Sequence, residues 1–323
     1  MTTTLIDGGL STQLETQGID LKLYPKLWTA GLLTTAKGQR ELLTAHQNYI
    51  VAGADIILTS SYQICPFMVN AEDLLVASRQ LALQAKDTSA STSQVFLSLG
   101  PWGATQADGS EYTGDYKELA TQDYLFKFHS KRLSILLQAG QHQSESVVDG
   151  LAFETIPSLL ELNAILLVME STTYDLPMWI SFSSPDGIHM CDGATFDSAV
   201  AQCLARFAAH PCSSPRILGV NCVHPSTIDP FLDIVLPLIP PGVLDGIALY
   251  PNNGGTWDAV KRCWCNDEDT ESKSKSKTST GFSGKAVEWR DRIVEQGLNC
   301  YIGGCCSTDA KTIAVLKERL VGV

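Results

Sequence analysis

Three of the ten cysteines stand where short apolar runs of the sequence end, and they are the residues best suited to chemistry. Cys222 follows one run, and Cys305 and Cys306 follow a pair of glycines after another. Three cysteine thiolates that hold one Zn²⁺ leave a fourth tetrahedral position for a substrate, which is the arrangement of a catalytic zinc site. The glycines would let the backbone approach closely enough for adjacent cysteines to face one ion. The pattern favours a zinc centre, although adjacent cysteines elsewhere are often buried small hydrophobes.

The other cysteines lack such a setting. Cys203 falls on the apolar face of a predicted helix and is expected in the core. For the Cys263-Trp264-Cys265 triplet, at the edge of a polar stretch, a metal site is the less favoured interpretation. His224 is better explained by a surface or capping role than by metal binding. Residues 1–10 contain neither the basic nor the apolar segment of a secretory signal, so we expect a cytoplasmic protein with reduced cysteines.

Two carboxylates, Asp7 and Glu154, also follow apolar runs. Taken alone, they could be the acid and base of a glycosidase-type hydrolase, which needs two carboxyl groups facing one bond. Beside the cysteines they suit a different task, the binding of a substrate ammonium group. A third interpretation, in which each side chain only caps the following helix, also stays open.

Four further side chains stand at the ends of these runs. Asn221 directly precedes Cys222, and we expect it to contact a substrate. Tyr62, Trp102 and Tyr250 place aromatic rings there, and such rings can face a cation. Rings in this position are also commonly packing residues, so both interpretations remain.

The apolar runs alternate with helical patterns, which is typical of parallel strands joined by helices. The predicted strands span residues 4–6, 54–59, 95–99, 148–153, 178–182, 217–220, 246–250 and 299–302. Eight such units favour a closed (β/α)8 barrel, or TIM barrel, over an open sheet. In this α/β fold the carboxyl ends of all strands meet at one rim, so the cysteines, carboxylates and rings would converge there.

Spacing of apolar residues predicts the helices between the strands. Phe196, Val200, Cys203 and Phe207 recur at helical spacing. Ser158 and Glu161 have the spacing of a capping box, which predicts that a helix begins there. Further helices are predicted over residues 71–85, 121–139 and 308–320.

The chain has 323 residues, which at about 150 residues per domain would suggest two domains. α/β barrels of this size are often single domains, and we expect residues 1–323 to form one barrel. Two polar stretches interrupt the pattern, Gly103–Asp115 and residues 266–284. The second has the composition of a mobile surface loop.

Composition and charge exclude several classes of partner. The chain is 44% hydrophobic and carries a formal net charge of −12, so it has the material for a large core but no basic footprint for nucleic acid. Its apolar runs are too short to span a bilayer. We therefore expect small-molecule substrates, with neither nucleic acid nor membrane as a partner.

Nine motifs along the chain resemble those of the homocysteine S-methyltransferase family, most closely the branch whose methyl donor is S-methylmethionine or S-adenosylmethionine. They are Asp7-Gly8-Gly9 with Glu15, Ala52-Gly53-Ala54, Ser61-Tyr62-Gln63, Gly100-Pro101-Trp102, Asp108–Tyr112 with Gly114-Asp115-Tyr116, Glu154-Thr155-Ile156-Pro157, Gly219–Cys222, Tyr250-Pro251-Asn252 and Ile302–Cys306. Each motif is short, but nine in the same order form a specific pattern.

The resemblance implies a (β/α)8 barrel in which Cys222, Cys305 and Cys306 are zinc ligands. It further implies that Asp7 and Glu154 bind the amino group of L-homocysteine. The expected reaction moves a methyl group from a sulfonium donor to the zinc-bound homocysteine thiolate and gives methionine. Such a donor leaves as a neutral thioether, so the reaction requires no general acid.

The chain departs from the family pattern in two places, and several alternatives remain. Residues 266–284 form a longer and more polar stretch than the family pattern leads us to expect, which puts no catalytic residue in doubt. The family often carries Gly-Glu after Asn253, whereas this chain has Gly254-Gly255, which leaves one acidic contact in doubt. Betaine or selenocysteine methyltransferase activity is compatible with the same motifs. Outside the family, the alternatives are the carboxylate-dependent hydrolase and a zinc-binding protein without activity.

Overall fold

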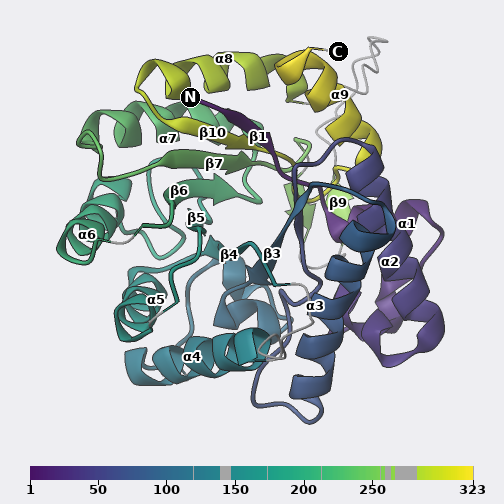
Figure 1. Cartoon of the computed structure of the whole chain (residues 1–323). Coiled ribbons are helices and arrows are strands. Elements are labelled where there is room, and N and C mark those ends of the chain that lie inside the picture. Colours follow the sequence, from purple (N-terminus) through teal and green to yellow (C-terminus); the bar gives the residue numbers. More distant parts are fainter. Residues whose placement is uncertain are drawn as a thin grey trace.

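The computed structural model describes residues 1–118, 120–138, 147–172, 174–211, 213–254, 256–258, 263–265 and 282–322. Eight parallel strands form one curved sheet inside a layer of helices (Figure 1). These strands are β1 (Thr3–Leu5), β2 (Ile56–Leu58), β3 (Gln94–Leu99), β4 (Gly150–Ile156), β5 (Met178–Phe182), β6 (Arg216–Asn221), β7 (Gly246–Tyr250) and β10 (Asn299–Ile302).

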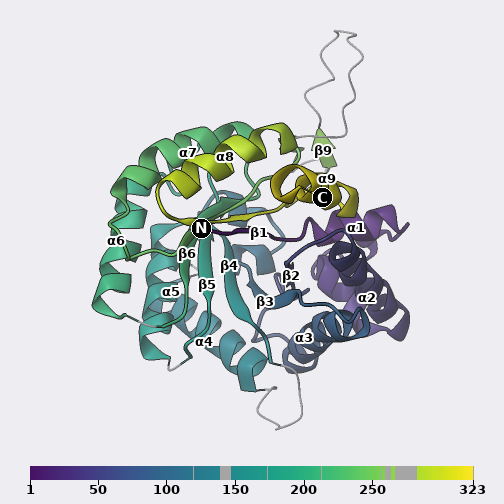
Figure 2. The ribbon, with the colours of Figure 1, turned by 45° about the horizontal axis from the view of Figure 1, so that its top comes forward.

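The sheet closes on itself, which confirms the predicted (β/α)8 barrel. Neighbouring strands follow the order β1-β10-β7-β6-β5-β4-β3-β2, and each pair is parallel. A parallel bridge between Ile6 and Ile56 joins the two outer strands of this order. Figure 2 shows the strands side by side inside the ring of helices.

Helices connect the strands on the outside of the barrel. They are α1 (Leu10–Thr16), α2 (Ala36–Val51), α3 (Ala71–Thr88), α4 (Gln122–Gln138), α5 (Leu159–Ser171), α6 (Phe196–Ala209), α7 (Ile228–Val235), α8 (Ser283–Glu295) and α9 (Ala310–Val321). Short 3-10 helices are η1 (Leu21–Leu23), η2 (Trp28–Thr34), η3 (Trp102–Thr105), η4 (Ser110–Tyr112), η5 (Pro225–Thr227) and η6 (Leu236–Leu238). The helices predicted from apolar spacing are confirmed, with small changes at their ends.

Some boundaries differ from the prediction in ways that matter for function. Strand β4 runs through Ile156 and β6 through Asn221, so Glu154 and Asn221 lie within the ends of their strands. A two-stranded antiparallel ribbon, β8 (Thr256–Asp258) and β9 (Cys263–Cys265), lies between β7 and β10 in the sequence. Of the predicted polar loop, residues 266–281 lie outside the described residues, whereas Ser283 and Gly284 belong to α8.

The core has two main parts. Inside the barrel, one cluster takes a residue from each of several strands and includes the stacked rings of Phe96 and Trp179, with centroids 4.9 Å apart. Between the sheet and the helices, a larger cluster contains the buried face of α6, with Cys203 in the core as predicted. Because both sides of the strands are covered, the strands read as nearly continuous apolar runs.

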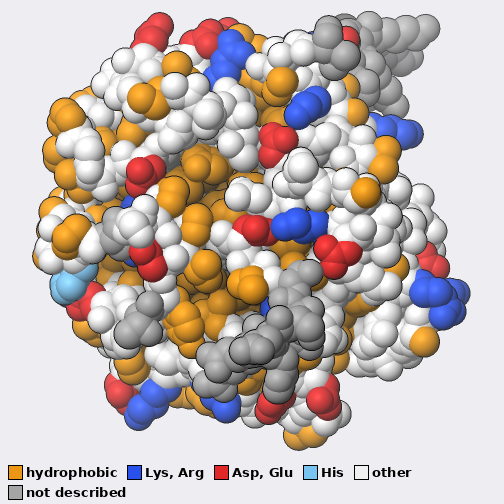
Figure 3. Space-filling model, viewed as in Figure 1, with side chains coloured by type: hydrophobic (Ala, Val, Ile, Leu, Met, Phe, Trp, Pro, Cys, Tyr) orange, Lys and Arg blue, Asp and Glu red, His pale blue; other side chains and the backbone are white. Residues whose placement is uncertain are grey.

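Hydrophobic and charged side chains occupy different parts of the molecular face that Figure 1 shows. Figure 3 shows hydrophobic side chains toward the middle of this face and charged side chains mainly around it. None of the helices within the described residues is long and apolar enough to span a bilayer.

Close packing between β6 and β7 yields a prediction. A Cβ atom at Gly219 would collide with the backbone oxygen of Ala248 on the neighbouring strand. We expect Gly219→Ala to lower the free energy of unfolding by about 1–3 kcal/mol, because backbone atoms cannot move aside cheaply. Urea denaturation of the variant and the parent protein measures this loss.

Gly284→Ala is the matched control. The nearest atom to a Cβ at Gly284 is the flexible end of Arg319, at 3.9 Å, and alanine favours the helix. Equal stability of the Gly219→Ala variant and the control would contradict the packing argument.

Candidate active site

A cavity of about 290 Å³ opens at the carboxyl ends of the strands. Side chains expected at the rim line it together, namely Asp7, Tyr62, Glu154, Asn221, Cys222, Tyr250, Cys305 and Cys306. They come from six different strand ends of the barrel. The structure therefore brings together every predicted site residue except Trp102.

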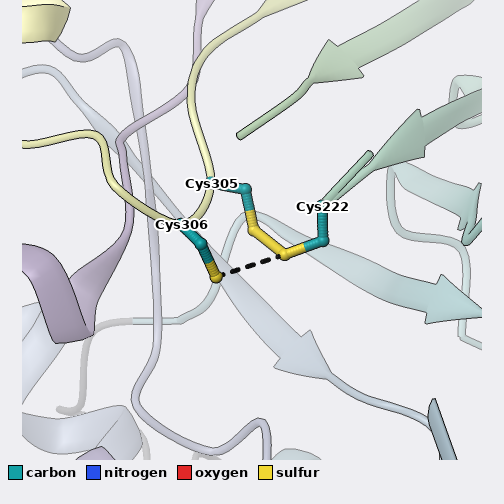
Figure 4. Close-up of side chains that lie close together, drawn as sticks. All are labelled: Cys222, Cys305 and Cys306. Carbon is teal, nitrogen blue, oxygen red and sulfur yellow. Dashed lines mark hydrogen bonds between the residues drawn. A yellow bond between two sulfur atoms is a disulfide. The ribbon is translucent and has the colours of Figure 1, made fainter. Parts of the chain in front are cut away.

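The three cysteines meet at one side of this cavity (Figure 4). Cys222 comes from the end of β6, and Cys305 and Cys306 come from the segment after β10. Their sulfur atoms all lie within 4.8 Å of one another. Cys222 has a φ of 52°, in the left-handed region that non-glycine residues seldom adopt. Such local strain is common at functional sites, where the surrounding fold holds it in place.

The expectation that all cysteines are free thiols is wrong for one pair. Cys222 and Cys305 are joined by a disulfide, and the Cys306 sulfur lies 3.5 Å from that of Cys222 (Figure 4). Sulfur atoms placed to share one ion lie close enough to bond to each other. A metal ligand must be a thiolate, so this pair has to be reduced before all three sulfurs can bind one ion.

The sulfur set fits a metal ion. Three cysteine sulfurs are soft ligands that suit zinc and related ions, and one tetrahedral position remains for a substrate atom. Burial raises the pKa of the Cys306 thiol to about 12, and the nearby carboxylates Glu111 and Glu15 raise it further. A cation at the sulfur reverses this effect, because it stabilises the thiolate.

Close backbone approach sets the position of Cys305 and Cys306, as the two preceding glycines predicted. A Cβ atom at Gly303 would lie 2.7 Å from the carbonyl oxygen of Asp7. The backbone N–H of Gly304 donates to that same oxygen over 3.0 Å. The segment after β10 is therefore fixed against the end of β1, and the cysteines lie beside the first carboxylate.

Asp7 is buried, with 3% of its surface exposed. Its carboxylate accepts a hydrogen bond from the backbone N–H of Leu58 over 2.8 Å. Burial raises its pKa well above the ordinary value, and the charge of Glu154 raises it further. The two carboxylates are thus close enough to repel each other.

Glu154 is buried too, and it accepts a short hydrogen bond from Ser98. Desolvation raises its pKa to about 7, although hydrogen bonds from Ser98 and Tyr250 act in the opposite direction. Neither carboxylate caps a helix, because α1 and α5 begin without them. The capping interpretation is wrong for both residues, and a buried acidic pair of this kind attracts a cation.

Asn221 holds the ends of β4 and β6 together. Its Oδ1 accepts from the backbone N–H of Thr155 over 2.7 Å and from the Ser181 hydroxyl over 2.7 Å. Its Nδ2 donates to the Thr155 hydroxyl over 2.8 Å. Thr155 has a φ of 60°, so Asn221 holds a strained residue next to Glu154. Asn221 also directly precedes Cys222, the second strained residue of the site.

The predicted aromatic residues have different surroundings. The Tyr250 hydroxyl accepts from Trp179 Nε1 over 2.9 Å and lies 2.5 Å from the Ser181 hydroxyl, so hydrogen bonds orient it. Tyr62 lines the cavity together with Thr155. Trp102 packs edge-on against Tyr116, outside the described lining of the cavity.

Trp102 belongs to a buried polar network behind the cavity wall. Its backbone N–H donates to Glu161 over 2.7 Å, and the same carboxylate accepts from Tyr116 and contacts His129 at 2.9 Å. Ser158 caps α5 as predicted, with its hydroxyl accepting from the Glu161 N–H, but the Glu161 side chain does not complete a capping box. It anchors the loop after β3 instead.

Three residues at the cavity had no predicted role. Glu111 and Tyr112 stand within the polar stretch Gly103–Asp115, which covers the site, and their motif was visible in the sequence. Trp28 had no such signal, and it reaches the cavity from η2 with a φ of 49°. His224 caps η5, as expected for a residue without a metal role.

The fold and the cysteine cluster define a class of protein, an α/β barrel with three cysteines at its rim that could hold a metal ion. The homocysteine S-methyltransferase family model matches residues 4–320. The chain therefore belongs to the homocysteine S-methyltransferase family, as its motifs predicted, and is an enzyme of that family.

Known proteins match over nearly the whole chain. It is 34% identical to homocysteine S-methyltransferase 3 of Zea mays over 336 residues, covering 98% of this chain and 89% of that protein. It is 32% identical to selenocysteine Se-methyltransferase of Brassica oleracea var. italica, with 98% and 88% covered. The metallated form of the Escherichia coli homocysteine methyltransferase MmuM is similar in structure, with a TM-score of 0.74, 28% identity, and 99% and 96% covered.

The buried charge of Glu154 makes stability depend on pH. Its pKa is about 7 in the folded chain and about 4.5 in the unfolded chain, so the folded state holds its proton more tightly. The tighter proton binding adds to the free energy of unfolding. This added stability is fully present below pH 4.5 and is lost as pH rises through 7. We expect the free energy of unfolding of Glu154→Gln, relative to that of the parent protein, to rise by up to about 3 kcal/mol as pH increases from 4.5 to 8. Denaturation of both metal-free proteins at each pH measures it, and a constant difference would refute the argument.

Proposed function

We propose that this enzyme transfers a methyl group from a sulfonium donor, S-methylmethionine or S-adenosylmethionine, to the sulfur of L-homocysteine and forms methionine. The observation that carries the proposal is the cluster of three cysteine sulfurs beside two buried carboxylates in one cavity. A thiol substrate with an ammonium group needs both features, and family membership supports the same reaction.

Cys222, Cys305 and Cys306 would hold Zn²⁺ when reduced. Bound zinc would lower the pKa of the homocysteine thiol, which is about 8.5 for a free thiol, and so supply the thiolate nucleophile. The MmuM structure in its metallated form supports a metal in this family, and the all-sulfur ligand set favours zinc. Three anionic sulfurs would keep the bound substrate sulfur electron-rich.

Asp7 and Glu154 would bind the ammonium group of homocysteine. Each carboxylate has a raised pKa because it is buried, and the charge of Glu154 raises the pKa of Asp7 further. An ammonium group between them would remove that repulsion and favour both ionised forms. Asn221 would keep Glu154 in place, and its remaining N–H would be available to the amino acid.

Tyr62 would place an aromatic ring at the donor, with Tyr250 in the wall beside Glu154. An electron-rich ring attracts a sulfonium cation, and a donor seated in the cavity would limit access of water to the sulfur atoms. Trp102 would act indirectly, because it packs behind the cavity wall. Alignment of the two sulfurs and the methyl group in line would supply a large part of the rate enhancement.

The transfer itself balances without a proton donor. A new bond forms between the homocysteine sulfur and the methyl carbon, while the electron pair of the old carbon–sulfur bond stays on the donor sulfur. Both products carry neutral thioethers. Exclusion of water by the bound reactants would favour this loss of charge over the separated ions.

One alternative acceptor has support from a comparison. The similarity to a selenocysteine Se-methyltransferase makes selenocysteine the acceptor to test beside homocysteine. Betaine is the alternative donor, since it is also a methylated cation. The carboxylate-dependent hydrolase has no support from family membership.

Removing one sulfur tests the metal site. We expect Cys222→Ala, Cys305→Ala and Cys306→Ala each to lower metal content and methionine formation together, the latter by at least about 100-fold. Reduced protein is loaded with zinc, its metal is counted by atomic spectroscopy, and methionine is measured with each donor.

Cys191→Ala is the control for loss of a cysteine near the site, because its sulfur donates to Ser183 and lies outside the triad. It should keep both metal and activity. Full metal content in all three triad variants would sink the ligand assignment, and no methionine from any sulfonium donor with the parent enzyme would sink the proposed reaction.

Neutralising the carboxylates tests homocysteine binding. We expect Asp7→Asn and Glu154→Gln each to raise the KM for homocysteine by about 10-fold or more, because a buried charged hydrogen bond is worth about 1.5–3 kcal/mol. Metal content should stay at the level of the parent protein. Steady-state kinetics at saturating donor measures the effect, and an unchanged KM in both variants would show that the ammonium group binds elsewhere.

A further inference from the structure

A third carboxylate, the partly buried Glu111, lies in the wall of the cavity, and the proposed function gives it no role. It stands on η4, in the loop that follows β3, whereas Asp7 and Glu154 belong to strand ends. Among the described residues it lines the same cavity as the three cysteines.

Glu111 lacks a partner that would neutralise it. Its Oε2 atom is inaccessible to solvent and makes no hydrogen bond in the structure. Burial raises its pKa to about 7, and the charge of Asp108 raises it further. A carboxylate oxygen that is buried without a hydrogen-bond partner is costly, and a positive charge that arrives with a ligand would compensate for that cost.

The surroundings of Glu111 place that charge near the reacting atoms. Glu111 and the neighbouring Tyr112 line one cavity together with Tyr62 and the three cysteines. Glu111 therefore lies in the wall of the space in which a methyl group would pass between sulfurs.

We propose that Glu111 binds the positive charge of the sulfonium group of the methyl donor. This inference rests on the proposed function and assigns the residue that selects cationic donors. The homocysteine ammonium already has two carboxylates, while the sulfonium otherwise meets only aromatic rings. Glu111 supplies a full opposite charge at that position.

The positive charge of the donor is lost during transfer, so Glu111 affects donor binding and the chemical step differently. An anion beside a sulfonium stabilises bound donor more than the transition state, in which the positive charge is already fading. Glu111 therefore tightens donor binding and does not speed the chemical step. It sets KM for the donor and leaves kcat equal or slightly reduced.

Glu111→Gln tests this assignment, because it removes the charge and keeps the shape. At saturating homocysteine we expect the KM for S-methylmethionine to rise about 10- to 100-fold, because the negative charge beside the sulfonium is lost. The kcat should not fall, and metal content and the KM for homocysteine should stay at the parent values. Glu111→Asp, which keeps the charge, should recover part of the lost affinity.

A neutral analogue separates charge from shape. 2-Amino-5-methylhexanoic acid has a CH group in place of the sulfonium sulfur of S-methylmethionine and keeps the ammonium group. Its inhibition constant should be equal in the parent enzyme and in Glu111→Gln. If S-adenosylmethionine is the working donor, S-adenosylhomocysteine, which lacks the methyl group and its charge, serves in the same way.

Glu118→Gln is the matched control, since it removes one negative charge from an exposed position of the same loop. It should leave the donor KM unchanged. An unchanged donor KM in Glu111→Gln overturns the inference, and so does an equal rise for the neutral analogue, which would assign Glu111 to the ammonium group or to cavity shape. A parent enzyme that forms no methionine overturns the proposed function instead, so the two failures are distinct.

Discussion

Negative charge buried at one end of the barrel is the constraint on which the site depends. Asp7, Glu111 and Glu154 all have raised pKa values in the same cavity, and burial is the largest cause for each. Three cysteine sulfurs that become thiolates would add to this charge. A protein keeps such an arrangement only if cations compensate for it, and the reactants of sulfonium-dependent methyl transfer bring them.

The fold holds these groups in place from behind. Asn221, at the end of β6, forms hydrogen bonds with Thr155 near the end of β4. One side chain therefore positions the chain neighbours of both residues, Glu154 and Cys222. Tyr49 of α2 donates to the carbonyl oxygen of Gly9 over 2.9 Å and thereby fixes the turn after Asp7. Arg132 of α4 donates to the carbonyl oxygen of Gly100 over 2.6 Å, at the start of the loop that carries Glu111. Rigid support of this kind is what preorganised sites require.

The sequence predicted the barrel and most of its site for a physical reason. Each strand is buried on both sides, so its apolar run is easy to read, and parallel strands must end at one rim. That rule alone brought Asp7, Glu154 and the cysteines together. Trp102 was misplaced because its ring turns toward α4 and α5, and strand-end position does not determine on which side of the wall a ring packs.

Trp28 and Glu111 show where such prediction stops. Both reach the cavity from 3-10 helices within long connections, whose path depends on tertiary contacts and not on any periodicity. The disulfide between Cys222 and Cys305 was missed for a related reason, since the sequence indicates three sulfurs on one ion but not their redox state.

The buried negative charge of the cavity would also make reactants bind more tightly than products. In the proposed reaction, homocysteine and the donor would enter with an ammonium group, a thiol that ionises and a sulfonium, each matched by a separate group in the cavity. After transfer both sulfurs would be neutral thioethers, so Glu111 and a metal held by the cysteines would no longer meet the charges that attracted the reactants. The ammonium group of methionine would still meet Asp7 and Glu154, but its sulfur would not bind as a thiolate. Product binding would therefore be weaker than reactant binding at the sulfur end, which would favour release.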